Sequence, residues 1–150
     1  MKKLVFKKEE AQPLVAFLQE ITLKNKVSRL RNKLIKKLTE IANETDEERI
    51  DLCKEHAEKD ENGEAIVEDD QYKVEDLEAL NKEIQDLFQE EVAVEVGEYS
   101  SDFSPLFNYL DSEAFDMELS GVEANRYDRL LDIWETSQSS DADSQNEEEK

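Results

Sequence analysis

The residues of this sequence best suited to hold a metal lie between positions 53 and 69. Cys53 and His56 are one helical turn apart, which is an acceptable spacing for two zinc ligands. The chain holds one Cys and one His in all, so no second residue of either type completes a nitrogen and sulfur site. We therefore expect Cys53 to pack as a small apolar residue and His56 to lie at, or half-buried near, a helix surface.

A second candidate is Glu58-x-Asp60-x-Asn62-Gly63-x5-Asp69, which has part of the spacing of a calcium-binding loop, including its turn glycine. It departs from that loop at both ends. Glu replaces the usual Asp at the first position, and Asp replaces the long bidentate Glu at the last. A hairpin or a solvated turn is the preferred interpretation, so we predict no metal and no cofactor.

Catalytic motifs give no further candidate. Asp and Glu make up 40 of the 150 residues, so pairs such as Asp69/Asp70 and Glu90/Glu91 are abundant. Abundance makes any one pair uninformative, because a catalytic carboxylate also needs a cleft and a perturbed pKa. The sequence contains no GxSxG, P-loop or GxGxxG motif. We therefore predict that the protein is not an enzyme.

The most distinctive property of the chain is its charge. The formal net charge is −21, yet residues 1–37 hold eleven Lys/Arg and three Asp/Glu, a local charge of +8. The remaining 113 residues carry −29. Such an excess of negative charge favours basic partners and repels nucleic acid, so direct nucleic-acid binding is the least favoured function.

The positive charge is concentrated in residues 24–38, KNKVSRLRNKLIKKL. A helix predicted over 26–42 places the apolar residues on one side and the cations on the other. We call these cations the basic strip, a candidate partner-binding surface: Arg29, Arg31, Lys33, Lys36 and Lys37. The strip has two interpretations. It contacts an external acidic group, or it neutralises the protein's own acidic helices, which is the favoured interpretation.

Negative charge is dense in a helix predicted over 75–91. We call the following residues the acidic face: Glu75, Asp76, Glu83, Asp86, Glu90 and Glu91. Carboxylates on one continuous surface can imitate the phosphates of duplex DNA. The competing and favoured interpretation is a solvated helix face.

These residues must be positioned by helices and strands, and the sequence pattern predicts which ones. The predicted fold is α+β, mainly helical, with about five helices and a few short strands. Helices are expected over 9–22, 26–42, 45–59, 75–91 and 121–136, with a short one beginning near Ser104. Strands are expected over 2–7 and 92–96, and the alternation of apolar and acidic residues over 115–119 suggests another. Thr45-Asp46-Glu47-Glu48 matches a capping box that separates the second helix from the third.

Residues 1–136 are predicted to form a single compact helix-rich domain. The segment 137–150, SQSSDADSQNEEEK, has one Ala as its only hydrophobic residue, which predicts a disordered acidic tail. The single Cys fits a reducing compartment. We find no apolar stretch long enough for a signal peptide or a membrane span, so a protein made inside the cell, without a membrane partner, is expected.

Several segments, taken in order, resemble a known family. They are KLVFK, LVAFLQ, LKNKVSRLRNKLIKKL, EERIDLCKEHAEKDENGEAIV and LSGVEANRYDRLLDIWE. Together they are similar to a small family of acidic proteins, with a domain of unknown function, encoded by tailed phages and prophages of Gram-positive bacteria. The resemblance spans about residues 1–136. Its most specific parts are K-x-SR-x-R, EHAEKDENGE and GVEA-x-x-YD.

The resemblance implies a phage origin and a location in the host cytoplasm or in the virion. No activity is established for that family, so no catalytic or binding residue is carried over. Our first hypothesis is a non-enzymatic phage accessory protein that acts through protein–protein contacts in virion or tail morphogenesis. The alternative is an acidic DNA-mimic inhibitor of a host defence or DNA-binding protein. The partner is then a phage structural protein or a host protein, and the oligomeric state is open.

Overall fold

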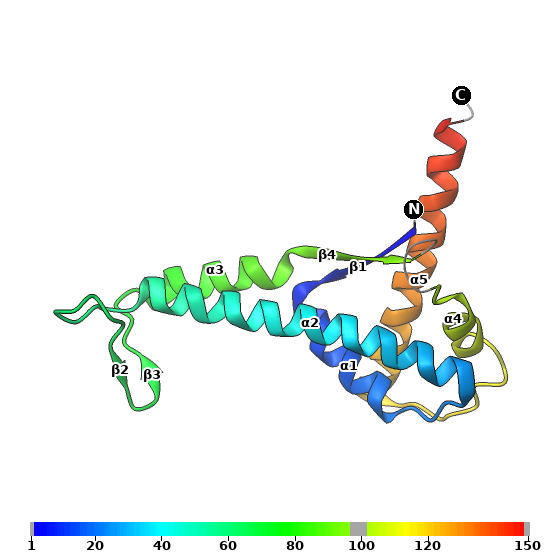
Figure 1. Ribbon diagram of the computed structural model, residues 1–150, viewed down its shortest axis with the longest axis horizontal. Coiled ribbons are helices and arrows are strands. Elements are labelled where there is room, and N and C mark those ends of the chain that lie inside the picture. The colour runs from blue at the N-terminus through cyan, green and yellow to red at the C-terminus, as the bar shows by residue number, and fades with distance from the viewer. Residues whose placement is uncertain (1, 97–101, 149–150) are drawn as a thin grey trace.

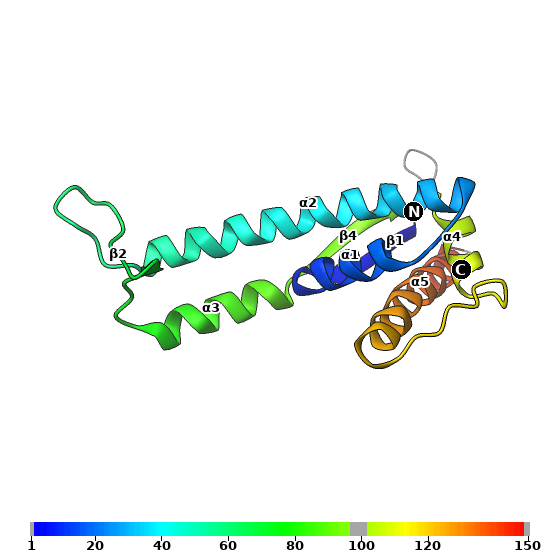
Figure 2. The same cartoon turned by 90° about the horizontal axis from the view of Figure 1, so that it is seen from below.

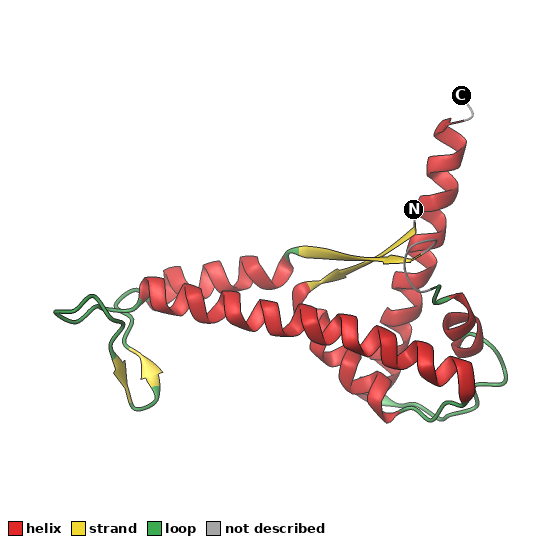
Figure 3. Ribbon diagram, viewed as in Figure 1, coloured by secondary structure: helices red, strands yellow, loops and turns green. Residues whose placement is uncertain are grey.

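The computed structural model describes the backbone of residues 2–96 and 102–148 and the side chains of residues 3–96 and 102–139. These ranges contain five α-helices, one short 3-10 helix and four short strands (Figure 3). Their order is β1 (Lys2–Lys7), η1 (Lys8–Glu10), α1 (Ala11–Glu20), α2 (Asn25–His56), β2 (Val67–Glu68), β3 (Gln71–Tyr72), α3 (Leu77–Gln89), β4 (Glu91–Val96), α4 (Ser104–Leu110) and α5 (Gly121–Glu148). The predicted helix-rich α+β fold is confirmed.

The molecule has a globular end and a long arm (Figures 1 and 2). At the globular end, α1, α4, α5 and the β1–β4 pair surround the N-terminal half of α2. The C-terminal half of α2 continues outward with α3 beside it, and the β2–β3 hairpin and the loop that precedes it lie at the outer end. We call residues 45–89, which include the C-terminal half of α2, the hairpin and α3, the arm.

β1 and β4 form a two-stranded antiparallel sheet, in register from Lys2 opposite Val96 to Lys7 opposite Glu91. Alternate residues of a strand point to opposite faces. Leu4 and Phe6 of β1 and Val94 and Val96 of β4 are therefore all buried on the inner face. Both strands lie where the sequence predicted them.

One hydrophobic cluster joins this inner face to the helices of the globular end. Its helical members include Phe17 of α1, Leu34 of α2 and Leu130 of α5, each 0–1% exposed. Phe107 of α4 stacks on Trp134 of α5 with ring centroids 4.6 Å apart. The arm lies outside this cluster and buries a smaller seam: Cys53 and Ala57 on one side of the arm and Leu80 and Leu87 of α3 on the other.

α2 is one continuous helix, so the predicted break near residue 44 and the separate helix over 45–59 are wrong. Its 32 residues span about 48 Å. Thr45 is buried inside the helix, and its hydroxyl donates to the Ile41 carbonyl oxygen at 2.8 Å. Ser and Thr side chains make this bond to residue i−4 within helices. The capping-box pattern therefore arises in a helix interior here, at the place where the arm leaves the globular end.

The charge along α2 runs against its own macrodipole. Residues 25–37 hold six Lys/Arg and no acid, whereas residues 40–56 hold seven Asp/Glu. Helices are stabilised by acids near the N-terminus and by cations near the C-terminus. Since helix stability does not explain this arrangement, the two charged halves are candidates for binding.

Two other expectations have clear outcomes. The hairpin that the sequence left open is present, and Asp69 and Asp70 form its turn with φ of 50° and 63°, as a type I′ turn requires. The strand suggested over 115–119 is wrong. Phe115 instead packs against the rings of Tyr109 and Tyr127, and no strand of the described chain pairs with it.

The C-terminal helix α5 extends as far as Glu148. Ser137 is buried, and its hydroxyl donates to the Trp134 carbonyl oxygen at 2.6 Å. Beyond Ser137, Ala142 is the only hydrophobic residue. The disorder predicted for 137–150 stays a prediction, and its last two residues lie outside the described part of the chain. None of the described helices combines the length and apolar character needed to cross a bilayer.

Candidate functional site

A groove of about 410 Å³ lies between α2 and α3 on the arm. Each helix contributes three carboxylates and one leucine at spacings of three and four residues, which place them on one helix face. We call this surface the acidic groove; it is lined by Glu48, Asp51, Leu52 and Glu55 of α2 and by Glu83, Asp86, Leu87 and Glu90, which come from α3 and its C-cap.

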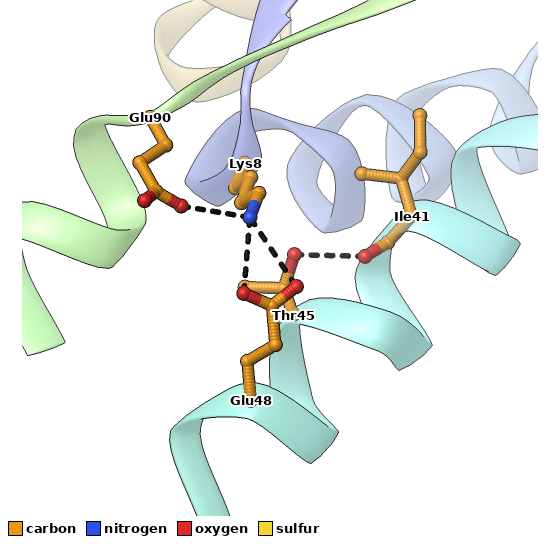
Figure 4. A network of polar contacts seen from close by, with 5 residues as sticks. All are labelled: Lys8, Ile41, Thr45, Glu48 and Glu90. Carbon is orange, nitrogen blue, oxygen red and sulfur yellow. Dashed lines mark hydrogen bonds and ion pairs between the residues drawn. The ribbon is translucent and has the colours of Figure 1, made fainter. Parts of the chain in front are cut away.

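Lys8 lies between Glu48 and Glu90, which line the end of the acidic groove nearest η1 (Figure 4). Its Nζ lies 2.8 Å from Glu90 Oε2 and 3.1 Å from Glu48 Oε2. The hydrogen bond to Glu90, with the bond to Glu48 and both charges, raises the pKa of Lys8 above its usual value although burial lowers it. Lys8 therefore stays protonated, offsets one of the two carboxylate charges at this end of the groove, and ties η1 to α2 and to the C-cap of α3.

His56 occupies the opposite end of the groove. It is the last residue of α2, and its Nε2 lies 2.7 Å from Glu83 Oε2. Between the two ends, Asp51, Glu55 and Asp86 form no ion pair with any described residue. The middle of the groove therefore presents three uncompensated carboxylates.

The floor of the groove is apolar. Leu87 is 6% exposed and Leu52 is half-buried beside it. A ligand that carries cations on an aliphatic stem matches both the floor and the rim, since Lys and Arg bury their methylenes while their charged ends reach carboxylates. Within the described residues, no group of three or more His, Cys, Asp or Glu is arranged to hold a metal ion.

The acidic face identified from sequence is only partly one surface. Glu83, Asp86 and Glu90 lie together in the groove. Asp76 instead caps α3, since its Oδ1 accepts from the Ala79 N–H at 3.1 Å, and Glu75 precedes it. Glu91 lies on β4.

Sequence reasoning missed the other half of the groove, which consists of Glu48, Asp51 and Glu55. The spacing of these acids in EERIDLCKE was visible. Nothing in the sequence showed that this stretch continues α2 and packs along α3, so the two rows of carboxylates could not be brought together.

The basic strip also divides into two sets. Arg29, Lys33 and Lys36 are exposed on the N-terminal half of α2, and none forms an ion pair with a described residue. The Lys and Arg residues that do form ion pairs in the described chain are Lys8, Arg49, Lys73 and Arg129. The favoured neutralisation of the strip thus does not occur through these ion pairs.

Arg31 has a structural position. Its guanidinium donates to the Ile21 carbonyl oxygen and, at 3.1 Å, to Ser28 Oγ. Ile21 is the C-cap of α1, where a cation satisfies a free carbonyl and suits the helix dipole. Arg31 lies two residues from Arg29, so the helical turn points it away from the exposed set and toward α1. Lys37 is half-buried beside β4.

The residues of the calcium-like segment support a turn. Asp60 Oδ1 accepts from the backbone N–H groups of Asn62 at 2.8 Å and Glu64 at 3.0 Å. Gly63 has φ of +82°, which favours glycine. Glu58 pairs with Lys73 across the base of the hairpin at 3.3 Å. Cys53 is buried in the arm.

Fold and groove together define a class: a small helix-rich protein whose distinctive surfaces are charged. Within that class, the chain belongs to the DUF1617 family of proteins of unknown function, whose sequence pattern matches residues 2–141. No curated protein and no solved structure matches the chain. The family covers the globular end and the whole arm, and the phage origin suggested by the resemblance belongs to the proposal below.

Proposed function

We propose that this protein is a non-enzymatic phage accessory protein that binds a basic segment of a partner protein in the acidic groove. The observation that carries the proposal is the set of three uncompensated carboxylates, Asp51, Glu55 and Asp86, above an apolar floor. The setting we propose is virion or tail morphogenesis in the host cytoplasm, with a phage structural protein as the partner.

The dimensions of the groove restrict the partner. The seven residue steps from Glu48 to Glu55 rise about 10 Å along α2. That length fits two turns of a helix or three to four extended residues. Two or three Lys or Arg side chains on such a segment would face the carboxylates, and one apolar side chain would contact Leu52 and Leu87.

The experiment is an affinity pull-down of the tagged protein from phage-infected cells, washed at low and at high salt. The test variant is Asp51→Asn/Glu55→Gln/Asp86→Asn, which removes the three charges and keeps the side-chain sizes. The matched control is Glu113→Gln/Asp116→Asn/Glu118→Gln, three exposed acids between α4 and α5.

We expect the wild-type protein and the control to recover the same tail or capsid protein, and the groove variant to lose it. Surface ion pairs are screened by salt, so recovery should fall between low and high salt. Equal recovery by the groove variant and the control would rule out the acidic groove as the docking site. Recovery of no virion protein by the wild type would count against the assembly role.

DNA mimicry is the second candidate, and the two facing rows of carboxylates support it. Acids along each row are about 5 Å apart, from the helical rise of 1.5 Å per residue. The groove presents only three per row, and Glu75, Asp76 and Glu91 lie outside it, so the row is short for duplex recognition. Recovery of a host DNA-binding protein that duplex DNA displaces would favour this candidate over assembly.

A further inference from the structure

The outer edge of β4 carries backbone groups that β1 does not use. The Lys8 N–H donates to the Glu90 carbonyl oxygen at 2.9 Å, so this pair continues the β1–β4 register as a hydrogen-bonded pair. Hydrogen-bonded pairs alternate along an antiparallel ladder. Val92, Val94 and Val96 therefore bond to β1, whereas the N–H and C=O groups of Glu91, Ala93 and Glu95 point away from it.

A groove of about 310 Å³ follows this edge. One wall is β4 from Val92 to Glu95, and the other is α2, through Lys37, Glu40, Ile41 and Glu44. Ile41 is half-buried and continues the apolar surface of Val92 and Val94. An extended chain laid in this groove would reach both the backbone groups of Ala93 and an apolar contact.

The opposite edge of the sheet differs. The Lys7 N–H, which points outward from β1, donates to Glu10 Oε1 at 2.9 Å, and Glu10 is held by Arg129 of α5. This contact caps one end of the β1 edge. The β4 edge has a groove in place of such a cap, which makes β4 the better template for an added strand.

We infer that the β4 edge binds an extended, basic segment of another protein as a third strand. Main-chain hydrogen bonds to Ala93 supply affinity, and alternate side chains supply specificity. Residues of the bound segment that lie opposite Glu91 and Glu95 are on the same solvent-exposed face as these two acids, so Lys or Arg is favoured at those positions. Residues of the bound segment that lie opposite Val92 and Val94 face α2, so aliphatic side chains are favoured at those positions. The fitting pattern is Lys-Val-x-Val-Lys. The inference is independent of the acidic groove.

A second copy of this chain is a poorer occupant. Antiparallel pairing of two β4 strands about Ala93 would place Glu91 of each copy opposite Glu95 of the other. Like charges directly opposite each other destabilise a sheet. Within one chain, by contrast, Glu91 and Glu95 lie opposite Lys7 and Lys3 of β1, which is the charge pattern that a basic ligand would repeat on the other side.

The test uses the full chain and the labelled peptide Lys-Val-Thr-Val-Lys, with Glu-Val-Thr-Val-Glu as its control, followed by NMR titration and fluorescence anisotropy. We expect the lysine peptide to shift the amide signal of Ala93 more than those of Val92 and Val94, which already bond to β1. Absence of binding by the lysine peptide, or equal binding of the glutamate peptide, would overturn the inference.

Two variants separate edge pairing from simple charge attraction. Ala93→Pro removes an N–H that points away from β1, so we expect about tenfold weaker binding, or 1.4 kcal/mol, while Ala93→Ser keeps the N–H and the affinity. Glu91→Lys leaves either peptide with one attractive and one repulsive charge pair, so it should abolish the preference between the two peptides. This variant keeps the test valid if Ala93→Pro fails to fold. Unchanged binding by a folded Ala93→Pro protein would exclude strand addition. The acidic-groove triple variant should bind the peptide normally, so failure of either proposal can be told from failure of the other.

Discussion

Glu10 shows how one side chain can join three elements. It lies at the end of η1, accepts the Lys7 N–H at the end of β1, and pairs with Arg129 of α5. Burial raises the pKa of Glu10, but the hydrogen bonds from Arg129 and Lys7, with their charges, lower it more. The pKa of the folded protein therefore lies below the ordinary value of 4.5.

A lowered carboxyl pKa makes stability depend on pH with a definite sign. The contribution is complete above pH 4.5 and is lost as the pH falls through the folded-state pKa, because the unfolded chain binds the proton more readily. We expect Glu10→Gln to lower the free energy of unfolding by about 1–2 kcal/mol at pH 7, and by less as the pH falls below 4.5. Urea unfolding at several pH values measures this, and a pH-independent loss would contradict it.

Arg31 and Arg29 form a matched pair for testing the division of the basic strip. Arg31→Met removes the donors to Ile21 and Ser28, so we expect a loss of about 1–2 kcal/mol in the free energy of unfolding. Arg29→Met removes an exposed side chain and should change it by less than about 0.5 kcal/mol. Chemical denaturation of both variants gives the comparison. Equal effects would mean that Arg31 is not a structural residue.

At the scale of elements, the arm depends on few contacts of its own. Its buried seam consists of Cys53, Ala57, Leu80 and Leu87, apart from the main core. Lys8 and His56 add polar links at the two ends of the groove. Regions with few buried apolar contacts open at lower free energy than the core, so the arm should exchange its amides faster than the globular end.

Leu80→Ala tests this separation. We expect it to lower the opening free energy of the arm by about 2–3 kcal/mol, because it leaves a cavity in a small seam. Trp134 is the only Trp and stacks on Phe107 in the globular end, so its fluorescence reports the core. Hydrogen exchange should therefore rise in α3 while the Trp134 emission spectrum stays unchanged. Loss of the folded emission in buffer would show that arm and core unfold together.

The same elements show what the sequence could predict. Apolar spacing placed β1, β4 and most helices correctly, because periodicity records which face is buried. The predicted start of a new helix at Thr45 is wrong because the capping-box pattern does not reveal whether tertiary packing continues the preceding helix. Prediction of the acidic groove requires knowing that α2 continues beyond residue 44 and packs along α3. Pairing between distant segments is set by packing, which local patterns do not encode.

At the scale of the whole molecule, charge is separated along the long axis. Residues 44–91 hold twenty of the forty acids and five Lys/Arg, a charge of −15, while the exposed cations of α2 lie at the globular end. Such separation orients an approaching partner before contact and makes its association rate depend on salt.

The C-terminal segment gives a prediction at this scale. Residues 140–150 offer one Ala as their only apolar side chain, so their deletion should change the free energy of unfolding by less than about 0.5 kcal/mol. Thermal unfolding of the shortened chain, followed by Trp134 fluorescence, measures the effect. A larger loss would mean that the segment packs against the folded part and is not a disordered tail.

The pairing of β1 with β4 also has a consequence for synthesis on the ribosome. Lys7 pairs with Glu91 and Lys2 with Val96, so β1 is synthesised 84 to 94 residues before the residues with which it pairs. At about 5–20 residues per second, that delay is roughly 4–19 s. During this time Leu4 and Phe6 have no sheet to enter. The nascent chain thus exposes its first strand longest, and the lysines that flank it on both sides limit its aggregation.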